Sequence, residues 1–496
     1  DRRSNPGVRR RRSGADRPAE QAPRVASVTV AVATVAFTAA LVAEATGGRL
    51  QAGSPDAVFA GVSIDSRTTA AGALFVAIQG DRFDGHEFVT DALSRGASGL
   101  LVSQPMEPPP NVSLIAVPDT LQALQDLARE IRRRSRAIVV AITGSAGKTS
   151  TKELTADLLA KRYRVFRNKG NLNNHIGLPL SLTELSAGYD MAVVELGMNH
   201  AGEIRSLVGI AEPDVRLWTN VGDAHIGFFG TRDAVAAAKA EILEASTAST
   251  LSVLNADDPL VMAAAANAVG RVVTFGTTPS ATIRATAIQD RGFAGTTVDV
   301  TSPAGPLRLT LALPGRAQVM NVLAAIAVAQ AYGIENQAIE ETLAAAQPVA
   351  RRGSVRPAPG GVTVVDDTYN ASPAAMEMML RTLAATPATG RRVAMLGEMK
   401  ELGDAARDLH ERCGHTAAES GIDLLIAVGG PAVDGLAAGA ISGGMPGSRI
   451  WRFEDSRAAA SRVSGLVHRG DVVLVKGSRS TRMDILADAL VAEGQA

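Results

Sequence analysis

Short apolar runs alternate with helix-like segments over most of the chain. Five such runs fall between residues 136 and 347, at 136–144, 163–168, 191–197, 215–221 and 250–257. Strands that alternate with helices are typical of βαβ units in a parallel sheet. The pattern therefore predicts a central, doubly wound and mostly parallel α/β domain over residues 136–347.

The regions on either side of this stretch show weaker forms of the same pattern. After residue 348, apolar runs recur at 362–367, 392–399, 424–430 and 472–479, and several of them end in charged or glycine residues. This predicts a Rossmann-like α/β domain over 348–496, whereas residues 28–135, with shorter strands between turn-rich loops, predict a smaller α/β domain. Ligands of open α/β sheets bind at the carboxyl ends of strands, so we expect the chemistry at these strand ends.

The first residues differ from the rest of the chain. Residues 1–27 contain eight arginines among Pro, Gly and Ser, which predicts a disordered tail. An uncharged run, 25–43, follows, and a basic segment before an apolar one resembles a signal peptide or an anchor. Because the run is rich in Ala, Val and Thr, we favour the first strand and helix of a soluble, cytoplasmic protein.

Composition narrows the possible functions. A chain of 496 residues is too long for one core, which favours three domains. Its 50 basic residues balance 50 acidic ones, so a nucleic-acid partner held by a basic surface is not expected. The single cysteine, Cys413, excludes an internal disulfide framework and a cysteine-based zinc cluster.

The stretch AITGSAGKTSTKE, residues 141–153, joins a predicted strand to a predicted helix. Such a turn directs backbone N–H groups and a helix N-terminus at phosphate oxygens. Lys148 would contact the β- and γ-phosphates of ATP, and the Thr149 hydroxyl would bind Mg²⁺. The usual glycine five residues before Gly147 is replaced by Ile142, so an ordinary glycine-rich turn with an exposed lysine stays a possible interpretation.

Three residues downstream of this loop are candidates for a cation site. Glu195 ends one predicted strand, His225 follows another, and Lys239 lies in a helical segment. A carboxylate and an imidazole at neighbouring strand ends can share a divalent cation. Taken singly, each also fits an ordinary role, as a helix cap, a loop histidine or a solvated helix lysine.

The order of these motifs is similar to that of the ATP-dependent Mur ligase family. The matching segments are TGSAGKTS, NLNNHIGLPL, VELGMNHAGEI, DAHIGFFG and AKAEI. The resemblance implies a short phosphate-binding loop formed by Gly144, Ser145, Ala146, Gly147, Lys148, Thr149 and Ser150. It also implies amide-bond formation through an acyl phosphate, with two Mg²⁺ ions bound by Thr149, Glu195, His225 and a carbamylated Lys239.

The flanking regions resemble the branch of this family that adds D-alanyl-D-alanine. Residues 63–93 are similar to a uridine-diphosphate-binding domain, in which Ser66 and Arg67 would contact the UDP-sugar; a turn with a local Asp–Arg pair is the alternative. The stretch VVDDTYNASPAAMEMML matches the C-terminal signature of that branch, as do LGEMKELGDAARDLH and VLVKGSR. The implied substrates are UDP-MurNAc-tripeptide and D-Ala-D-Ala, and we expect a monomer without stable membrane insertion.

Further roles follow at the matched positions. Asp366 or Asp367 would bind ribose hydroxyls or the nucleotide, and Asn321 would lie near the adenine. The expected substrate contacts are Asn171, Asn173, Asn174, His175, Tyr369, Asn370, Lys476, Ser478 and Arg479. The chain departs from the family at Ala317, where a histidine is usual. It also departs at Arg351-Arg352, because the family more often has a single arginine followed by a bulky apolar residue, and either arginine could fill that role.

Two other classes of protein remain open on the sequence. A folylpolyglutamate-synthase-like ligase shares the loop and the metal residues but would not begin with a UDP-binding domain. A plain phosphate-loop ATPase or kinase, or a binding module without catalysis, would not need Glu195, His225 and Lys239 together.

Overall fold

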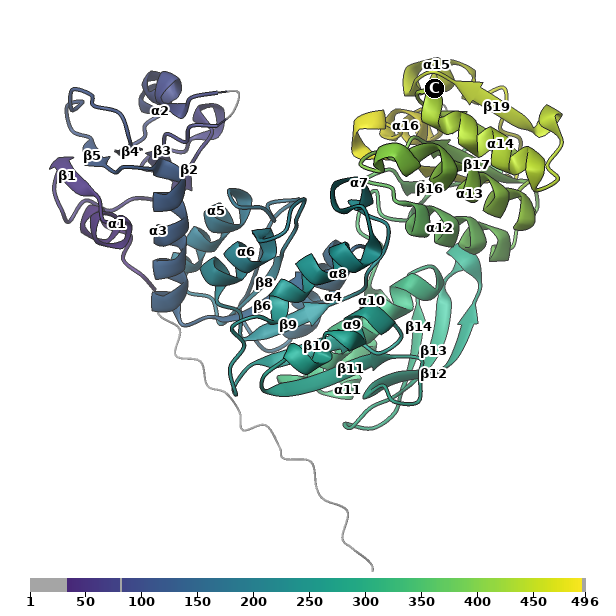
Figure 1. The fold of residues 1–496 in the computed structure, drawn as a ribbon, viewed down its shortest axis with the longest axis horizontal. Coiled ribbons are helices and arrows are strands. Elements are labelled where there is room, and N and C mark those ends of the chain that lie inside the picture. The colour runs from purple at the N-terminus through teal and green to yellow at the C-terminus, as the bar shows by residue number, and fades with distance from the viewer. Residues whose placement is uncertain (1–33, 81–82, 493–496) are drawn as a thin grey trace, which may run out of the picture.

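The computed structural model describes residues 34–80 and 83–492. The predicted tail, residues 1–27, lies outside them. Three α/β domains follow one another along the chain, and the central one lies between the other two (Figure 1). The predicted fold class is confirmed.

The N-terminal domain contains a five-stranded sheet with the order β1-β5-β4-β3-β2. Only β1 pairs antiparallel with its neighbour. The strands are β1 (Arg49–Ala52), β2 (Val62–Ser63), β3 (Leu74–Val76), β4 (Gly99–Val102) and β5 (Ser113–Ala116). The helices are α1 (Ala39–Thr46), α2 (Val89–Ser94) and α3 (Thr120–Ser135).

The central domain contains a nine-stranded sheet with the order β14-β13-β12-β11-β10-β9-β6-β8-β7. Strands β6 to β12 are parallel, and β13 and β14 extend the sheet antiparallel. The strands are β6 (Ile138–Thr143), β7 (Val165–Arg167), β8 (Met191–Glu195), β9 (Val215–Trp218), β10 (Leu251–Asn255), β11 (Arg271–Gly276), β12 (Ile283–Asp290), β13 (Thr296–Thr301) and β14 (Leu307–Leu311). The helices are α4 (Lys148–Leu159), α5 (Gly177–Thr183), α6 (Glu203–Ala211), α7 (Ile226–Phe229), α8 (Arg232–Ala240), α9 (Pro259–Ala263), α10 (Gly315–Ala331) and α11 (Asn336–Ala345).

The C-terminal domain contains a six-stranded sheet with the order β15-β16-β20-β17-β18-β19, in which only β15 is antiparallel. The strands are β15 (Ser354–Ala358), β16 (Val362–Asp367), β17 (Arg392–Gly397), β18 (Leu424–Val428), β19 (Ile450–Phe453) and β20 (Val472–Lys476). The helices are α12 (Pro373–Ala385), α13 (Ala406–Glu419), α14 (Asp434–Ser442), α15 (Ser456–Val463) and α16 (Asp484–Ala492). None of the helices in the described ranges is long and apolar enough to cross a membrane.

Helix α3 joins the N-terminal and central domains. The Asp119 carboxylate caps it by accepting N–H groups of the first turn, and Leu124, Leu127 and Ile131 are fully buried. These side chains belong to one apolar cluster that extends from Phe37 into the central domain. A shared core of this kind holds the two domains as one packed unit.

The central and C-terminal domains meet at two places. Phe293, in the turn between β12 and β13, packs into the apolar core of the C-terminal domain, and its N–H donates to the Thr386 hydroxyl at 2.9 Å. The second contact lies around α7, which approaches the C-terminal domain near α13 (Figure 1).

Candidate active site

The segment after β6 has the conformation of a phosphate-binding loop. Gly144 (φ 149°) and Gly147 (φ 84°) both adopt backbone conformations that side chains rarely tolerate. A Cβ atom at Gly144 would lie 1.9 Å from the Thr219 hydroxyl, and one at Gly147 would lie 2.3 Å from the Asn321 side-chain oxygen. Both glycines are therefore required by the packing beneath the loop.

Thr149 and Glu195 are in direct contact. Strands β6 and β8 are neighbours, and their pairing of Ile142 with Glu195 brings the end of β8 beside the loop. The Thr149 hydroxyl donates to one Glu195 carboxylate oxygen at 2.7 Å, and the Asn173 amide donates to the other at 2.8 Å. The carboxylate is buried and held in a fixed orientation.

Two lysines approach this pair from different helices. Lys148 begins α4 and donates to the Gly144 carbonyl at 2.7 Å. Lys239, in α8, is 1% exposed, and its ammonium forms no hydrogen bond or ion pair with the described part of the chain. Burial lowers the pKa of Lys239 well below its usual value, and the charge of Lys148 lowers it further, while Glu195 acts in the opposite direction.

His225 contacts the C-terminal domain. It precedes α7 with a left-handed backbone (φ 66°). Its Nδ1 lies 2.8 Å from a carboxylate oxygen of Glu401, but off the line of a good hydrogen bond. The close contact with His225, together with the charge of its ring, holds the pKa of Glu401 below its usual range, against the opposing effect of burial.

A cleft of about 1200 Å³ lies between the central and C-terminal domains. It brings together most of the residues predicted from the sequence. These are Ser145, Ala146, Gly147, Lys148, Thr149, Ser150, Asn171, Asn173, Asn174, His175, Glu195, His225, Asn321, Tyr369, Asn370, Lys476, Ser478 and Arg479. Five predicted residues do not line the cleft: Gly144, Lys239, Asp366, Ser66 and Arg67. Lys239 nevertheless lies close enough to Lys148 and Glu195 for their charges to shift its pKa.

Tyr369 and two arginines form the wall of this cleft on the C-terminal domain. Arg352 lies over the Tyr369 ring at 4.0 Å, and Arg479 lies over it at 5.5 Å. Arg352 also lines the cleft and lowers the pKa of Lys148, after the larger effect of burial. This wall therefore presents positive charge towards the phosphate-binding loop.

Lys476 is already paired within the protein. Strands β16 and β20 are neighbours and align Asp367 with Lys476. The buried Lys476 ammonium donates to the Asp367 carboxylate at 2.5 Å and to the Asn370 carbonyl at 2.9 Å. The Ser478 hydroxyl accepts the Lys400 N–H at 2.9 Å. All three of Lys476, Ser478 and Arg479 line the cleft, but only the Arg479 side chain forms no hydrogen bond or ion pair within the described part of the chain.

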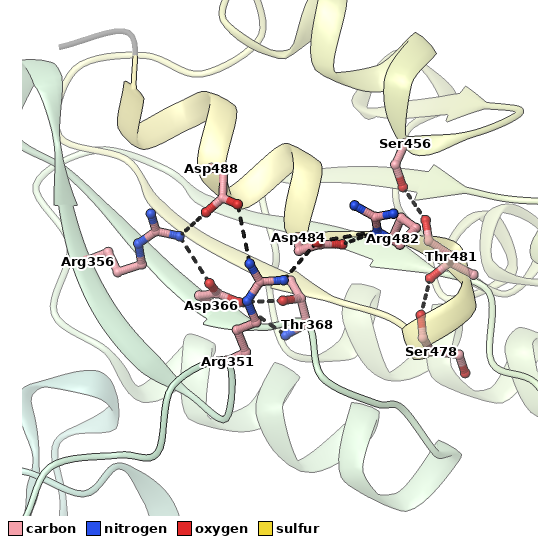
Figure 2. Close-up of polar contacts among 10 residues, drawn as sticks. All are labelled: Arg351, Arg356, Asp366, Thr368, Ser456, Ser478, Thr481, Arg482, Asp484 and Asp488. Carbon is pink, nitrogen blue, oxygen red and sulfur yellow. Dashed lines mark hydrogen bonds and ion pairs between the residues drawn. The ribbon is translucent and has the colours of Figure 1, made fainter. Parts of the chain in front are cut away.

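Asp366 does not line the cleft, whereas Asp367 does. Asp366 is 2% exposed, accepts the Thr368 hydroxyl at 2.6 Å and lies 3.1 Å from Arg356. Figure 2 shows Arg351 and Arg356 directed towards the acidic residues of α16, with Asp366 beneath them. The two arginines therefore lie in different places: Arg351 is held on α16, and Arg352 enters the cleft.

Ser66 and Arg67 show the local arrangement that was the alternative interpretation. Arg67 forms a two-pronged pair with Asp65, at 2.9 and 2.7 Å, on an exposed turn. Ser66 is buried at the start of that turn. The Asn174 side-chain oxygen is likewise used locally, because it accepts the Gly177 N–H at the start of α5 at 2.8 Å. UDP-sugar contacts by Ser66 and Arg67 stay a prediction.

Two residues of the cleft were missed as candidates. Glu401 lies in the segment LGEMKELG, which had been matched as a motif without a role for any of its side chains. Arg352 had been noted only as one of two equivalent arginines. The signal for Arg352 was present in the sequence, whereas the contact of Glu401 with His225 joins residues far apart in the chain.

The donors around Glu195 suit a hard divalent cation. The Thr149 hydroxyl and the Glu195 carboxylate offer oxygen atoms beside the phosphate-binding loop, as Mg²⁺ prefers. No three His, Cys, Asp or Glu side chains within residues 34–80 and 83–492 cluster closely enough to hold a metal. A further anionic ligand would have to come from phosphate or from a modified Lys239.

Three stretches of the chain match one protein family. Residues 58–132 match the Mur ligase family catalytic domain, residues 142–329 the Mur ligase middle domain, and residues 351–479 the Mur ligase glutamate ligase domain. The chain belongs to the Mur ligase family.

Several relatives that match most of the chain at about a third identity are D-alanyl-D-alanine-adding ligases. A relative from Synechocystis, named UDP-N-acetylmuramoyl-tripeptide–D-alanyl-D-alanine ligase, is 35% identical over 87% of this chain and 92% of its own length. A crystal structure of MurF from Acinetobacter baumannii is 30% identical with a TM-score of 0.82, covering 92% of this chain and 99% of that one. MurF from Thermotoga maritima in complex with ADP, also 30% identical, has a TM-score of 0.77 over 88% and 98% of the two chains.

Proposed function

We propose that the protein is a cytoplasmic, monomeric ATP-dependent ligase that joins D-alanyl-D-alanine to UDP-N-acetylmuramoyl-tripeptide. The products are the UDP-MurNAc-pentapeptide, ADP and phosphate, and the reaction serves peptidoglycan precursor synthesis. The observation that carries this proposal is the cleft itself. It places the phosphate-binding loop and Glu195 opposite Arg352, Tyr369 and Arg479, in a chain similar over most of its length to enzymes of that name.

The wall of the cleft that the central domain forms would hold ATP. Backbone N–H groups of the loop and the N-terminus of α4 would face its phosphates, with Lys148 turning from the Gly144 carbonyl towards them. Mg²⁺ bound near Thr149 and Glu195 would offset phosphate charge when present. We infer two such ions, with His225 and a carbamylated Lys239 as further ligands, because the Lys239 amine is buried beside Glu195 and its neutral form is favoured.

The C-terminal wall would complete the reaction. The terminal carboxylate of the tripeptide attacks the γ-phosphate, and ADP leaves with the electron pair of the broken bond. The acyl phosphate formed then reacts with the amine of D-Ala-D-Ala, which releases phosphate. Arg352 would hold the transferred phosphoryl group from the C-terminal side, and Arg479 would bind the dipeptide carboxylate.

Acceptor-dependent phosphate release tests this function. Purified protein, ATP and UDP-MurNAc-tripeptide should release phosphate with D-Ala-D-Ala and much less with single amino acids. Mass spectrometry should show the pentapeptide product. Equal ATP hydrolysis without either substrate would instead identify a plain ATPase and contradict the proposal.

A further inference from the structure

The loop that carries His225 is attached to the C-terminal domain through Glu401. The Gly227 N–H donates to the Glu401 carbonyl at 3.0 Å, and the Glu401 carboxylate lies 2.8 Å from His225 Nδ1. A Cβ atom at Gly227 would lie 2.6 Å from that carbonyl, so the two backbones touch. Glu401 itself adopts a left-handed backbone (φ 65°), which is costly for a residue with a side chain.

A buried charge two residues before His225 crosses the same boundary. The Asp223 carboxylate is 3% exposed and pairs with Arg232 of its own domain. It also accepts from Arg412 of α13 at 2.9 Å, and Arg412 pairs in turn with Glu377 of α12 at 2.6 Å. The position of the His225 loop is therefore set by the C-terminal domain as well as by the central one.

The contact leaves His225 suited to bind a cation. Glu401 lies against Nδ1, while Nε2 forms no hydrogen bond within the described ranges and the residue lines the cleft. Histidines that bind metals are commonly oriented by a carboxylate at the second ring nitrogen. Here that carboxylate comes from a different domain.

We propose that Glu401 is a positioning residue for His225, so that the divalent-cation site of the central domain is completed by the C-terminal domain. The inference rests on the proposed function, because it takes His225 as a cation ligand. It goes further in making cation affinity depend on how the two domains meet.

Manganese titration of the full chain tests the inference directly. Free Mn²⁺ is followed by electron paramagnetic resonance in the presence of ADP, which gives a dissociation constant without any turnover. Glu401→Ala should weaken Mn²⁺ binding by about 10- to 100-fold, the usual size for loss of an outer carboxylate. Glu401→Gln, which keeps an oxygen acceptor, should recover most of the affinity. Asp404→Ala, which removes an exposed carboxylate from the same loop, should bind as the wild type does.

A double-mutant cycle separates positioning from a merely structural role. In a His225→Ala background, Glu401→Ala should add no further loss of Mn²⁺ affinity. Three results would each overturn the inference. The losses of Mn²⁺ affinity could simply add in the double mutant, or either Glu401→Ala or His225→Ala could bind Mn²⁺ as the wild type does. If Glu401→Ala does not fold, as thermal unfolding would show, the same cycle run with Glu401→Met decides, because methionine keeps the length of the side chain without an oxygen acceptor for Nδ1, and full additivity there also overturns the inference. If the cycle gives the expected result but the wild-type protein forms no pentapeptide, the substrate assignment is refuted and the inference about Glu401 stands.

Discussion

Lys239 shows how strongly burial can change the chemistry of one residue. An ammonium that is 1% exposed and lies near the cation of Lys148 is costly to keep charged. A neutral amine is the form that reacts with carbon dioxide, and the carbamate formed would be an anion beside Lys148. The location of Lys239 thus supports its proposed role as a carbamylated cation ligand.

Lys239→Ala should abolish most of the ligase activity. We expect a loss on the order of 100- to 1,000-fold in kcat, as when one preorganised electrostatic group is removed from an active site. Acetate or propionate should restore part of the activity by supplying a carboxylate to the vacated space. The matched control is Lys161→Ala, which removes an exposed lysine. Unchanged activity of Lys239→Ala in the phosphate-release assay would contradict the carbamate proposal.

At the scale of single elements, the turn between α11 and β15 separates two adjacent arginines. Arg351 has a left-handed backbone (φ 62°), and its guanidinium pairs with Asp484 of α16 at 2.8 Å (Figure 2). The chain direction then places Arg352 on the opposite side, over the Tyr369 ring. One short turn therefore gives two identical side chains different surroundings.

These surroundings predict different effects of the two substitutions. Arg352→Ala should lower kcat/KM for ATP by about 100-fold, because a cation facing the phosphate-binding loop is lost. The kcat/KM of Arg352→Lys should lie between those of the wild type and of Arg352→Ala, since lysine keeps the charge but not the planar stacking on Tyr369. Arg351→Ala, its neighbour, should cost at most about 1 kcal/mol of unfolding free energy, as for other exposed ion pairs, and leave kcat/KM near the wild-type value. Steady-state kinetics measure kcat/KM, and urea unfolding measures the unfolding free energy of each variant. Equal losses of kcat/KM in Arg351→Ala and Arg352→Ala would contradict the different roles given to the two arginines.

For the whole molecule, the contacts between the central and C-terminal domains matter most. The acyl phosphate of the proposed reaction would hydrolyse in water, so the two walls of the cleft must meet around it. The buried Asp223 carboxylate and Arg412 hold the domains together on the side of α7, and Phe293 does so on the other.

Reversing one charge in this contact should open the molecule. Arg412→Glu would place a carboxylate next to Asp223 and Glu377, a juxtaposition of like charges that costs several kcal/mol. We expect a larger radius of gyration in small-angle X-ray scattering and a lower kcat, while ATP binding by the loop persists. Arg407→Glu, an exposed change on the same helix, is the control. A scattering curve identical to that of the wild type would show that this pair does not hold the domains.

The sequence alone was enough for the features that depend on local order along the chain. Alternating apolar runs predicted the parallel sheets, because a strand and the helix after it are coded by neighbouring residues. The loop at Gly144 to Thr149 and the approach of Glu195 followed for the same reason, since neighbouring parallel strands end at one edge of the sheet.

The tertiary structure decided the features that depend on contacts between distant segments. It placed the Asp366 carboxylate beside Arg356 and Thr368, and the Asp367 carboxylate beside Lys476. Successive side chains of a strand point to opposite faces, and the neighbour of β16 is β20. It also separated Arg352 from Arg351 and brought Glu401 to His225, a pair 176 positions apart in the sequence. No local pattern records such a pair, because the contact exists only where two separately folded domains meet.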